Sequence, residues 1–330
     1  MVIVTDSFGN ELGPVQKLKK LDVDLNETQD FELTIPAGAW DPQLFADENR
    51  IFVTGEEFGG IIGGKKTDTS DGTIILKGRN WRGILSKKII EPPAGEDYKI
   101  VSGELNHILR TLITAAGLGK LITVPEESTE TTVTSFQFDR YITLLEGIDK
   151  LLVSKGYRLQ IDYIRQELAP GYVQMQAVPV TDYSDQVELS QNNRLQFTFE
   201  ETKNGVNHLI CLGKGELKDR VVLHLYIQKN GTVGTKKYYT GLQEVVEVYD
   251  FSSAESEELT EKGTEKLLEL ANQKRFAMDI TKTDINMQIG DIIGGRDYIT
   301  GMSIKKPIIN KIYTLQNGRA GIEYRLKGDD

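Results

Sequence analysis

Four Asp-Gly or Asn-Gly dipeptides, each set between β-rich segments, limit the architectures open to this chain of 330 residues. They are Asp71-Gly72, Asn204-Gly205, Asn230-Gly231 and Asn317-Gly318. Asn, Asp and Gly tolerate the positive φ angles of a type I′ turn, and that turn matches the twist of an antiparallel hairpin. The flanking segments alternate apolar and polar residues or are rich in β-branched residues. The sequence therefore predicts a mainly β protein built from hairpins.

The middle of the chain has a helical pattern instead. Apolar residues recur at i, i+3 and i+4 between Ser102, the expected N-cap, and Gly117, the expected first residue after the helix. Thr143 and Glu146 have the spacing of a capping box and predict a second helix, which Gly156 ends. Residues 98–185 are therefore expected to form a mixed α+β domain.

We expect two β domains around this insertion, at residues 1–97 and 186–330. The second contains a third predicted helix near 252–275, which starts at a capping box of Ser252 and Glu255. An Ile-Ile-Gly-Gly segment occurs at 61–64 and again at 292–295, each followed by a basic residue and a hairpin. This is either a chance match or the sign of two β units of the same design.

Composition excludes several classes of protein. The 39 basic and 49 acidic residues give a net charge of −10, which is unfavourable for gripping nucleic acid phosphates. No apolar segment is long enough to span a bilayer, and no secretory leader is recognisable at the N-terminus. Cys211 is the only cysteine, so an internal disulfide is impossible and folding in a reducing cytoplasm is expected.

No catalytic or cofactor-binding pattern is present. His107, His208 and His224 are the only histidines, and none has a familiar metal-ligand spacing. No Gly-x-Ser-x-Gly segment occurs, and Cys211 in an alternating strand is expected to be a core residue rather than a nucleophile. We therefore expect no enzyme activity, no cofactor and no metal.

The segment KGRNWRGILSKKIIEPPAG at 77–95 is the best candidate for a special role. Trp81, between Arg79 and Arg82, is expected to cover the open end of a β-barrel, with the arginines at its rim or at a subunit interface. The alternative is a ligand site built on the exposed indole. Pro92-Pro93 predicts an extended linker into the next domain.

Four segments together resemble the central hub (baseplate hub) proteins of long-tailed bacteriophages and prophages, in particular siphovirus-type minor tail proteins. They are GTIILKGRNWRGILSKKIIEPPAG, SFQFDRYITLLEGIDKLLVSKGYRLQIDY, GVNHLICLGKGELKDRVVLHLY and IGDIIGGRDYITGMSIKKPIINKIYTLQNGRAGIEYRLKG. The similarity spans nearly the whole chain in order. Lys87-Lys88 stands where such proteins more often have arginine, which weakens any inference about a specific contact there.

This resemblance implies an α+β, mainly β fold with two small tail-tube-like β-barrels and an inserted mixed α+β domain. It implies a homotrimer whose barrels form a ring in a virion tail, assembled in the bacterial host cytoplasm. The ring would join the tail tube protein and tape measure to a spike or fibre, and DNA would pass through its acidic lumen without binding. Two alternatives stay open: a carbohydrate-binding tail module, and a tail-associated peptidoglycan hydrolase.

Overall fold

A computed structural model of the chain describes residues 1–126, 128–166, 168–184, 196–201, 205–271, 274–279, 286–296, 301 and 303–326. Contacts divide the chain into two compact units. Unit 1 comprises residues 1–196 and 278–327, and unit 2 is built on residues 197–277. The predicted division at 97/98 and 185/186 is finer than this grouping and stays a prediction. No helix among the described residues is long and apolar enough to cross a membrane.

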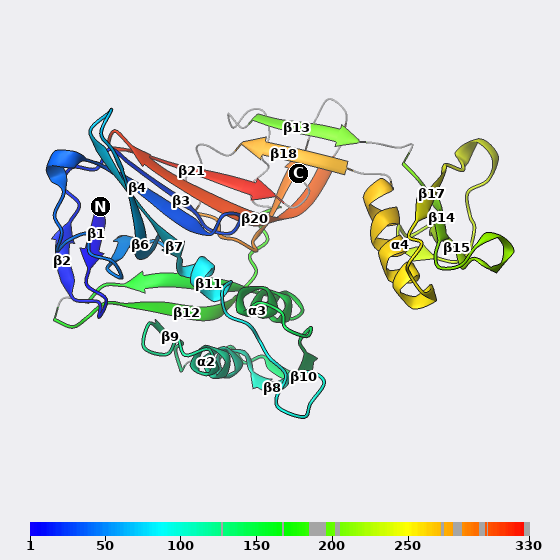
Figure 1. The fold of residues 1–330 in the computed structure, drawn as a ribbon, viewed down its shortest axis with the longest axis horizontal. Coiled ribbons are helices and arrows are strands. Elements are labelled where there is room, and N and C mark those ends of the chain that lie inside the picture. Colours follow the sequence, from blue (N-terminus) through cyan, green and yellow to red (C-terminus); the bar gives the residue numbers. More distant parts are fainter. Residues whose placement is uncertain are drawn as a thin grey trace. The chain divides into compact units, whose positions relative to one another are not determined.

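Unit 1 is organised around one ten-stranded antiparallel sheet (Figure 1). Its strands are β1 (Val2–Thr5), β2 (Glu11–Pro14), β3 (Lys20–Asp24), β4 (Asp30–Pro36), β5 (Arg50–Val53), β6 (Gly59–Asp68), β7 (Thr73–Asn80), β19 (Ile292–Arg296), β20 (Ser303–Gln316) and β21 (Arg319–Leu326). Their order is β19-β20-β3-β4-β7-β6-β5-β1-β2, with β21 also paired to β20. This confirms the mainly β prediction. Among the described residues the path is open, so the two barrels stay a prediction.

Local sequence explains the hairpins of this sheet. Asn317 and Gly318 connect β20 to β21 with φ angles of 52° and 75°, as the type I′ prediction requires. Between β6 and β7 the hairpin is present but the predicted type I′ turn is wrong, because residues 69–72 form the connection and Gly72, but not Asp71, has a positive φ. Phe31, Leu33 and Ile35 alternate along β4 and are all buried, as the pattern predicts. The two Ile-Ile-Gly-Gly segments lie in β6 and β19 of this one sheet.

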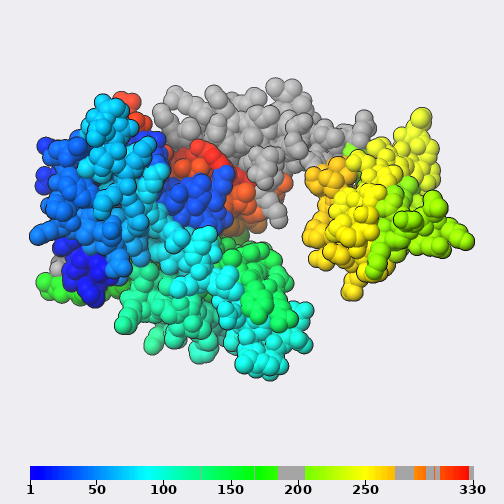
Figure 2. Space-filling model, viewed as in Figure 1, coloured from blue at the N-terminus to red at the C-terminus, as the bar shows by residue number. Residues whose placement is uncertain are grey.

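The inserted part of unit 1 is an α+β structure. It contains β8 (Ile100–Glu104), α2 (Leu105–Ala115), β9 (Ile122–Thr123), β10 (Thr132–Gln137), α3 (Leu144–Val153), β11 (Tyr157–Ile164) and β12 (Tyr172–Pro179). β8 pairs with β10, and the other strands form the sheet β11-β12-β9. Figure 2 shows this part (green) packed directly against the N-terminal strands (blue). One apolar core runs through both, because Ile3 and Phe52 belong to the same cluster as Ile148 and Met175.

Unit 2 contains a four-stranded sheet and one helix. The sheet order is β16-β15-β14-β17, with β14 (His208–Leu212), β15 (Val222–Ile227), β16 (Val233–Gly234) and β17 (Val246–Asp250). Helix α4 (Ser256–Leu270) packs Leu259 and Leu267 against Leu209 and Leu225. β13 (Gln196–Glu201) and β18 (Lys274–Asp279) form a separate two-stranded sheet. The turn at Asn230-Gly231 joins β15 to β16, whereas Asn204 lies outside the described residues.

Two predicted helix starts are wrong. Ser102 lies in β8, and the N-cap of α2 is Glu104, whose carboxylate accepts a hydrogen bond from the His107 backbone N–H at 2.8 Å. Pairing of β8 with β10 keeps residues 100–104 extended past Ser102. Helix α4 starts at Ser256 rather than after Ser252, because the carbonyl of buried Ala254 accepts a bond from the Lys214 N–H. The cap at Thr143 is confirmed.

Close packing between β6 and β7 generates a first prediction. A Cβ atom on Gly78 would collide with the carbonyl oxygen of Ile61 and lie 2.8 Å from the Phe31 ring, whereas one on Gly64 would enter open space. We expect Gly78→Ala to lower the free energy of unfolding by about 1–3 kcal/mol or more through overpacking. Gly64→Ala, the matched control on the same hairpin, should be within about 1 kcal/mol of wild type. Urea unfolding followed by circular dichroism measures both, and equal stabilities would refute the packing argument.

Candidate functional site

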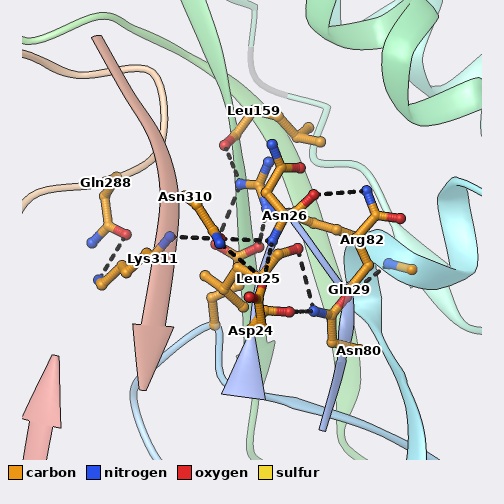
Figure 3. Close-up of polar contacts among 12 residues, drawn as sticks. Asp24, Leu25, Asn26, Gln29, Asn80, Arg82, Leu159, Gln288, Asn310 and Lys311 are labelled. Carbon is orange, nitrogen blue, oxygen red and sulfur yellow. Dashed lines mark hydrogen bonds and ion pairs between the residues drawn. The ribbon is translucent and has the colours of Figure 1, made fainter. Parts of the chain in front are cut away.

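The candidate site from the sequence surrounds the short helix α1 (Trp81–Leu85), which directly follows β7. Asn80 caps this helix, since its Oδ1 accepts a hydrogen bond from the Gly83 N–H at 2.7 Å. The Asn80 amide also donates to the backbone carbonyls of Asp24 and Leu25 (Figure 3). Asn80 is fully buried, so both of its polar ends need these partners. The start of α1 is therefore fixed to the turn between β3 and β4.

That turn is fixed in its own right to a strand from the other end of the chain. Asn310 in β20 accepts from the Asn26 N–H at 2.9 Å and donates to Asp24 Oδ1 at 3.0 Å. Asn26 also donates to the Ile309 carbonyl at 2.9 Å. Figure 3 shows these side chains converging between β3 and β20. The geometry of α1 thus depends on residues more than 200 positions away.

Trp81 lies in the core between the large sheet and the inserted part, with only 1% of its surface exposed. Its ring stacks on Tyr163 of β11 at a centroid distance of 5.8 Å, and Tyr163 stacks on Phe52 of β5 at 3.9 Å. Its indole N–H has no hydrogen-bond partner among the described residues. The aromatic column therefore joins α1, β5 and β11. Whether Trp81 also closes a barrel stays a prediction.

The two arginines beside Trp81 have different environments. Arg82 is buried and its Nε donates to Glu57 Oε1 at 2.6 Å, while its Nη2 donates to the Leu159 carbonyl at 3.2 Å. Burial favours a lower pKa for Arg82, but the charges of Glu57 and Asp149 outweigh it and the pKa is raised. Arg79 is exposed on β7, opposite Asp30 of β4. Of the two arginines, only Arg79 offers its charge to a partner outside the chain.

Two further cations with partners inside the chain lie in the same unit, half-buried Arg158 and buried Lys311. Arg158 of β11 pairs with fully buried Asp291 at 2.7 Å, and Asp291 also accepts from the Thr181 and Gln288 N–H groups. Lys311 of β20 is 1% exposed, and its Nζ donates to Asn286 at 2.8 Å and to Gln288 at 3.1 Å. Burial lowers the pKa of Lys311, against the opposing charges of Glu56 and Glu57. These contacts hold β11, β20 and the segment before β19 together.

The structure brings together two residues that sequence reasoning kept apart. His208 Nε2 lies 2.8 Å from His224 Nδ1, and His208 Nδ1 lies 2.7 Å from Glu244 Oε1. The two histidines lie on paired strands, 16 positions apart, which no short-motif search detects. His107 is exposed on α2, and Cys211 is buried in the core of unit 2, where burial raises its pKa to about 11. No group of three metal-ligating side chains occurs among the described residues.

Three grooves among the described residues lack the clustered aromatic side chains of a sugar-binding cleft. Three shallow grooves within the described residues have volumes of about 530, 510 and 400 Å³. The first is lined by no aromatic side chain, the second by Tyr239 alone and the third by Phe45 alone. A sugar-binding groove is expected to present clustered aromatic faces.

Comparison with solved structures identifies the fold. The chain is similar to a tail protein from Neisseria meningitidis, with 16% identity, a TM-score of 0.52 and coverage of 99% of this chain and 96% of that one. The 43 kDa tail protein of prophage MuSo2 from Shewanella oneidensis matches with 12% identity, a TM-score of 0.53 and coverage of 100% and 98%. Prophage tail protein gp18 from Listeria monocytogenes matches with 12% identity, a TM-score of 0.51 and coverage of 100% and 95%.

No family model and no curated protein matches this sequence. The structural similarity extends over nearly the full length of each of the three tail proteins. The fold is therefore that of phage and prophage tail proteins, which confirms the resemblance to tail proteins and the mainly β, α+β class, while the two barrels stay a prediction.

The buried position of Trp81 generates a second prediction. Trp81→Ala should lower the free energy of unfolding by about 3–5 kcal/mol, because it leaves a cavity between the sheet and the inserted part. Trp81→Phe is the control: it retains an aromatic ring beside Tyr163 and removes an unpaired N–H, so its cost should be clearly smaller. Thermal unfolding measures both variants. An alanine variant that melts with wild type, or a phenylalanine variant as unstable as the alanine one, contradicts this packing role.

Asp149 of α3 generates a third prediction. Burial raises its pKa to about 6 from its ordinary value of 3.8, although Arg82 acts in the opposite direction. The folded state therefore holds the proton more tightly than the unfolded state. This raised pKa stabilises the folded state by at most roughly 3 kcal/mol. The stabilisation is fully present below about pH 4 and is lost as the pH rises through about 6.

Asp149→Asn should remove this pH dependence. We expect the variant to be more stable than wild type at pH 7.5 and close to wild type at pH 4. Asp139→Asn is the control, because Asp139 is exposed and pairs with Lys150 in solvent. Melting temperatures of the three proteins between pH 4 and pH 8 measure the effect. An asparagine variant that is less stable than wild type at pH 7.5 would show that the charged carboxylate is needed by Arg82.

Proposed function

We propose that this chain is a structural hub subunit of a phage or prophage tail tip or baseplate. In this role it forms a ring that joins the tail tube to a distal spike or fibre. The observation that carries the proposal is the full-length similarity of its fold to three tail proteins. The distal tail or tube protein, the tape measure and the spike or fibre are the proposed partners. The proposed location is the virion tail, after assembly in the host cytoplasm.

The proposed ring is a homotrimer in which each chain contributes two tail-tube-like barrels, from residues 1–97 and 186–330, around the insertion at 98–185. Trp81 and Arg82 act inside the protomer, where they hold the first barrel against the insertion. Arg79 faces the neighbouring subunit, because its side chain is exposed at the edge of the α1 corner. The buried ion pairs of unit 1 support a rigid building block, since each has its partner inside the chain.

An acidic face on the sheet supports the passage of DNA. Asp22 of β3 lies opposite Glu32 of β4, and Asp24 lies opposite Asp30. On the next strand, β7, Lys77 lies opposite Glu32 and Arg79 lies opposite Asp30, and these two cations neutralise the acidic face in part. If this face lines the lumen, it repels phosphates and offers DNA no continuous basic track.

A carbohydrate-binding tail module is the second candidate, and a tail-associated peptidoglycan hydrolase is the third. The grooves with one aromatic residue or none favour the hub over the carbohydrate module. A hydrolase needs a nucleophile, a base and an orienting group within hydrogen-bond reach of one another. The buried thiol of Cys211 has a raised pKa, which disfavours it as that nucleophile.

The fourth prediction tests the ring. At concentrations well above micromolar, or beside its tail partners, the wild-type protein should form a trimer, measured by light scattering and negative-stain electron microscopy. Arg79→Glu should weaken this trimer and leave the circular dichroism spectrum unchanged, because it alters only an exposed charge. Arg140→Glu is the matched control, since Arg140 is exposed in the inserted part.

Two results would count against the hub. A wild-type protein that stays monomeric beside intact tail partners contradicts the ring. Binding to bacterial cell-wall glycans that Tyr239→Ala in the second groove abolishes would favour the carbohydrate module instead.

A further inference from the structure

One face of the unit 2 sheet carries a pair of histidines whose ring nitrogens point at each other. Residues alternate along β14, so Leu209 and Cys211 face the core under α4 while His208 and Ile210 face the opposite side. His208 is paired with Tyr226 and Ile210 with His224, so His208 and His224 are diagonal neighbours on that face. His224 is exposed, and His208 is nearly buried.

The inner ring is held firmly. His208 Nδ1 lies 2.7 Å from Glu244 Oε1, and its ring stacks on Tyr226 at a centroid distance of 4.4 Å. Glu244 also pairs with Lys237 at 2.7 Å. Glu244 therefore accepts hydrogen bonds from both the Lys237 ammonium and the His208 ring.

The ionised carboxylate determines which nitrogen of His208 carries the proton. Nδ1 donates to Glu244, so Nε2 presents a lone pair toward His224. A histidine that donates one ring N–H to a carboxylate and presents the other nitrogen is the usual arrangement of a metal-ligating histidine. In the absence of a cation, the His224 Nδ1–H occupies this lone pair at 2.8 Å.

We propose that His208 Nε2 and His224 Nδ1 bind a divalent transition-metal cation of the zinc and copper class. On binding, His224 shifts its proton from Nδ1 to Nε2, and both rings stay neutral. Metal–nitrogen distances of about 2.0–2.1 Å in tetrahedral geometry require the two nitrogens to be about 3.3 Å apart. The two nitrogens now point at each other, so the exposed ring of His224 must swing sideways until both lone pairs converge on the cation.

The composition of the site predicts its behaviour. No third protein ligand occurs with these two in the part of the chain that the structure describes, so water completes the coordination. Copper should bind more tightly than zinc, in line with the general order of affinities for nitrogen ligands. The charged groups at the pair are Glu244 and Lys237.

The fifth prediction uses the fact that the chain has only three histidines. The full chain, without a histidine tag and with ¹⁵N-labelled histidine, is titrated with substoichiometric Cu²⁺ and followed by NMR. The paramagnetic ion should broaden the ring signals of His208 and His224 and leave those of His107 sharp. His107 lies in unit 1 on α2 and serves as the internal control. Broadening of His107 first, or of all three equally, overturns the site.

Zinc titration calorimetry with variants tests the roles of the individual residues. His224→Gln should weaken zinc binding at least tenfold, and Glu244→Gln should weaken it about 10- to 100-fold by removing the partner of His208 Nδ1. His107→Gln should bind zinc as wild type does. Circular dichroism checks that each variant is folded, and exposed His224 is the substitution least expected to disturb folding. Two outcomes refute the proposal. One is that the wild type does not bind zinc at 1 mM, roughly a tenfold excess over protein. The other is that His224→Gln binds zinc as tightly as the wild type does.

Discussion

The buried ion pair of Arg82 with Glu57 is the interaction on which the arrangement of unit 1 depends. Glu57 comes from the turn between β5 and β6, Arg82 comes from α1, and the same guanidinium reaches the Leu159 carbonyl of β11. A buried charge that loses its partner costs several kcal/mol, so these three elements cannot separate without a large penalty. The stacked rings of Trp81, Tyr163 and Phe52 also join the large sheet to the inserted part. The ion pair and the aromatic stack therefore connect the same elements.

The polar side chains that the structure buries in unit 1 hold its strands together. Asn80, Arg82, Asp291 and Asn310 are among them, and they join strands that are distant in the sequence. Each such contact is costly to break, because it would leave a buried polar group without its partner. On the exposed side of β3, β4 and β7, charged side chains pair across the strands instead, as Lys77 does with Glu32.

Predictions succeeded where the cause was local. The turn at Asn317-Gly318, the alternation in β4 and the cap at Thr143 depend on residues within a few positions of one another. They failed where a distant strand intervened: pairing of β8 with β10 moved the start of α2, and the bond from Lys214 to Ala254 delayed α4. Arg82 was expected at a rim or interface because its side chain is charged, and only the position of Glu57 explains why it is buried instead.

The sequence by itself determined the mainly β class and the helical character of the insertion, since hydrophobic period and turn chemistry act over short distances. Only the tertiary structure decided that β20 pairs with β3, that Asn310 meets Asp24 and Asn26, and that His208 meets His224. The side-chain contacts among them join residues from 16 to 286 positions apart. Their free energy depends on the simultaneous burial and hydrogen bonding of both partners, and no pattern confined to one segment encodes that.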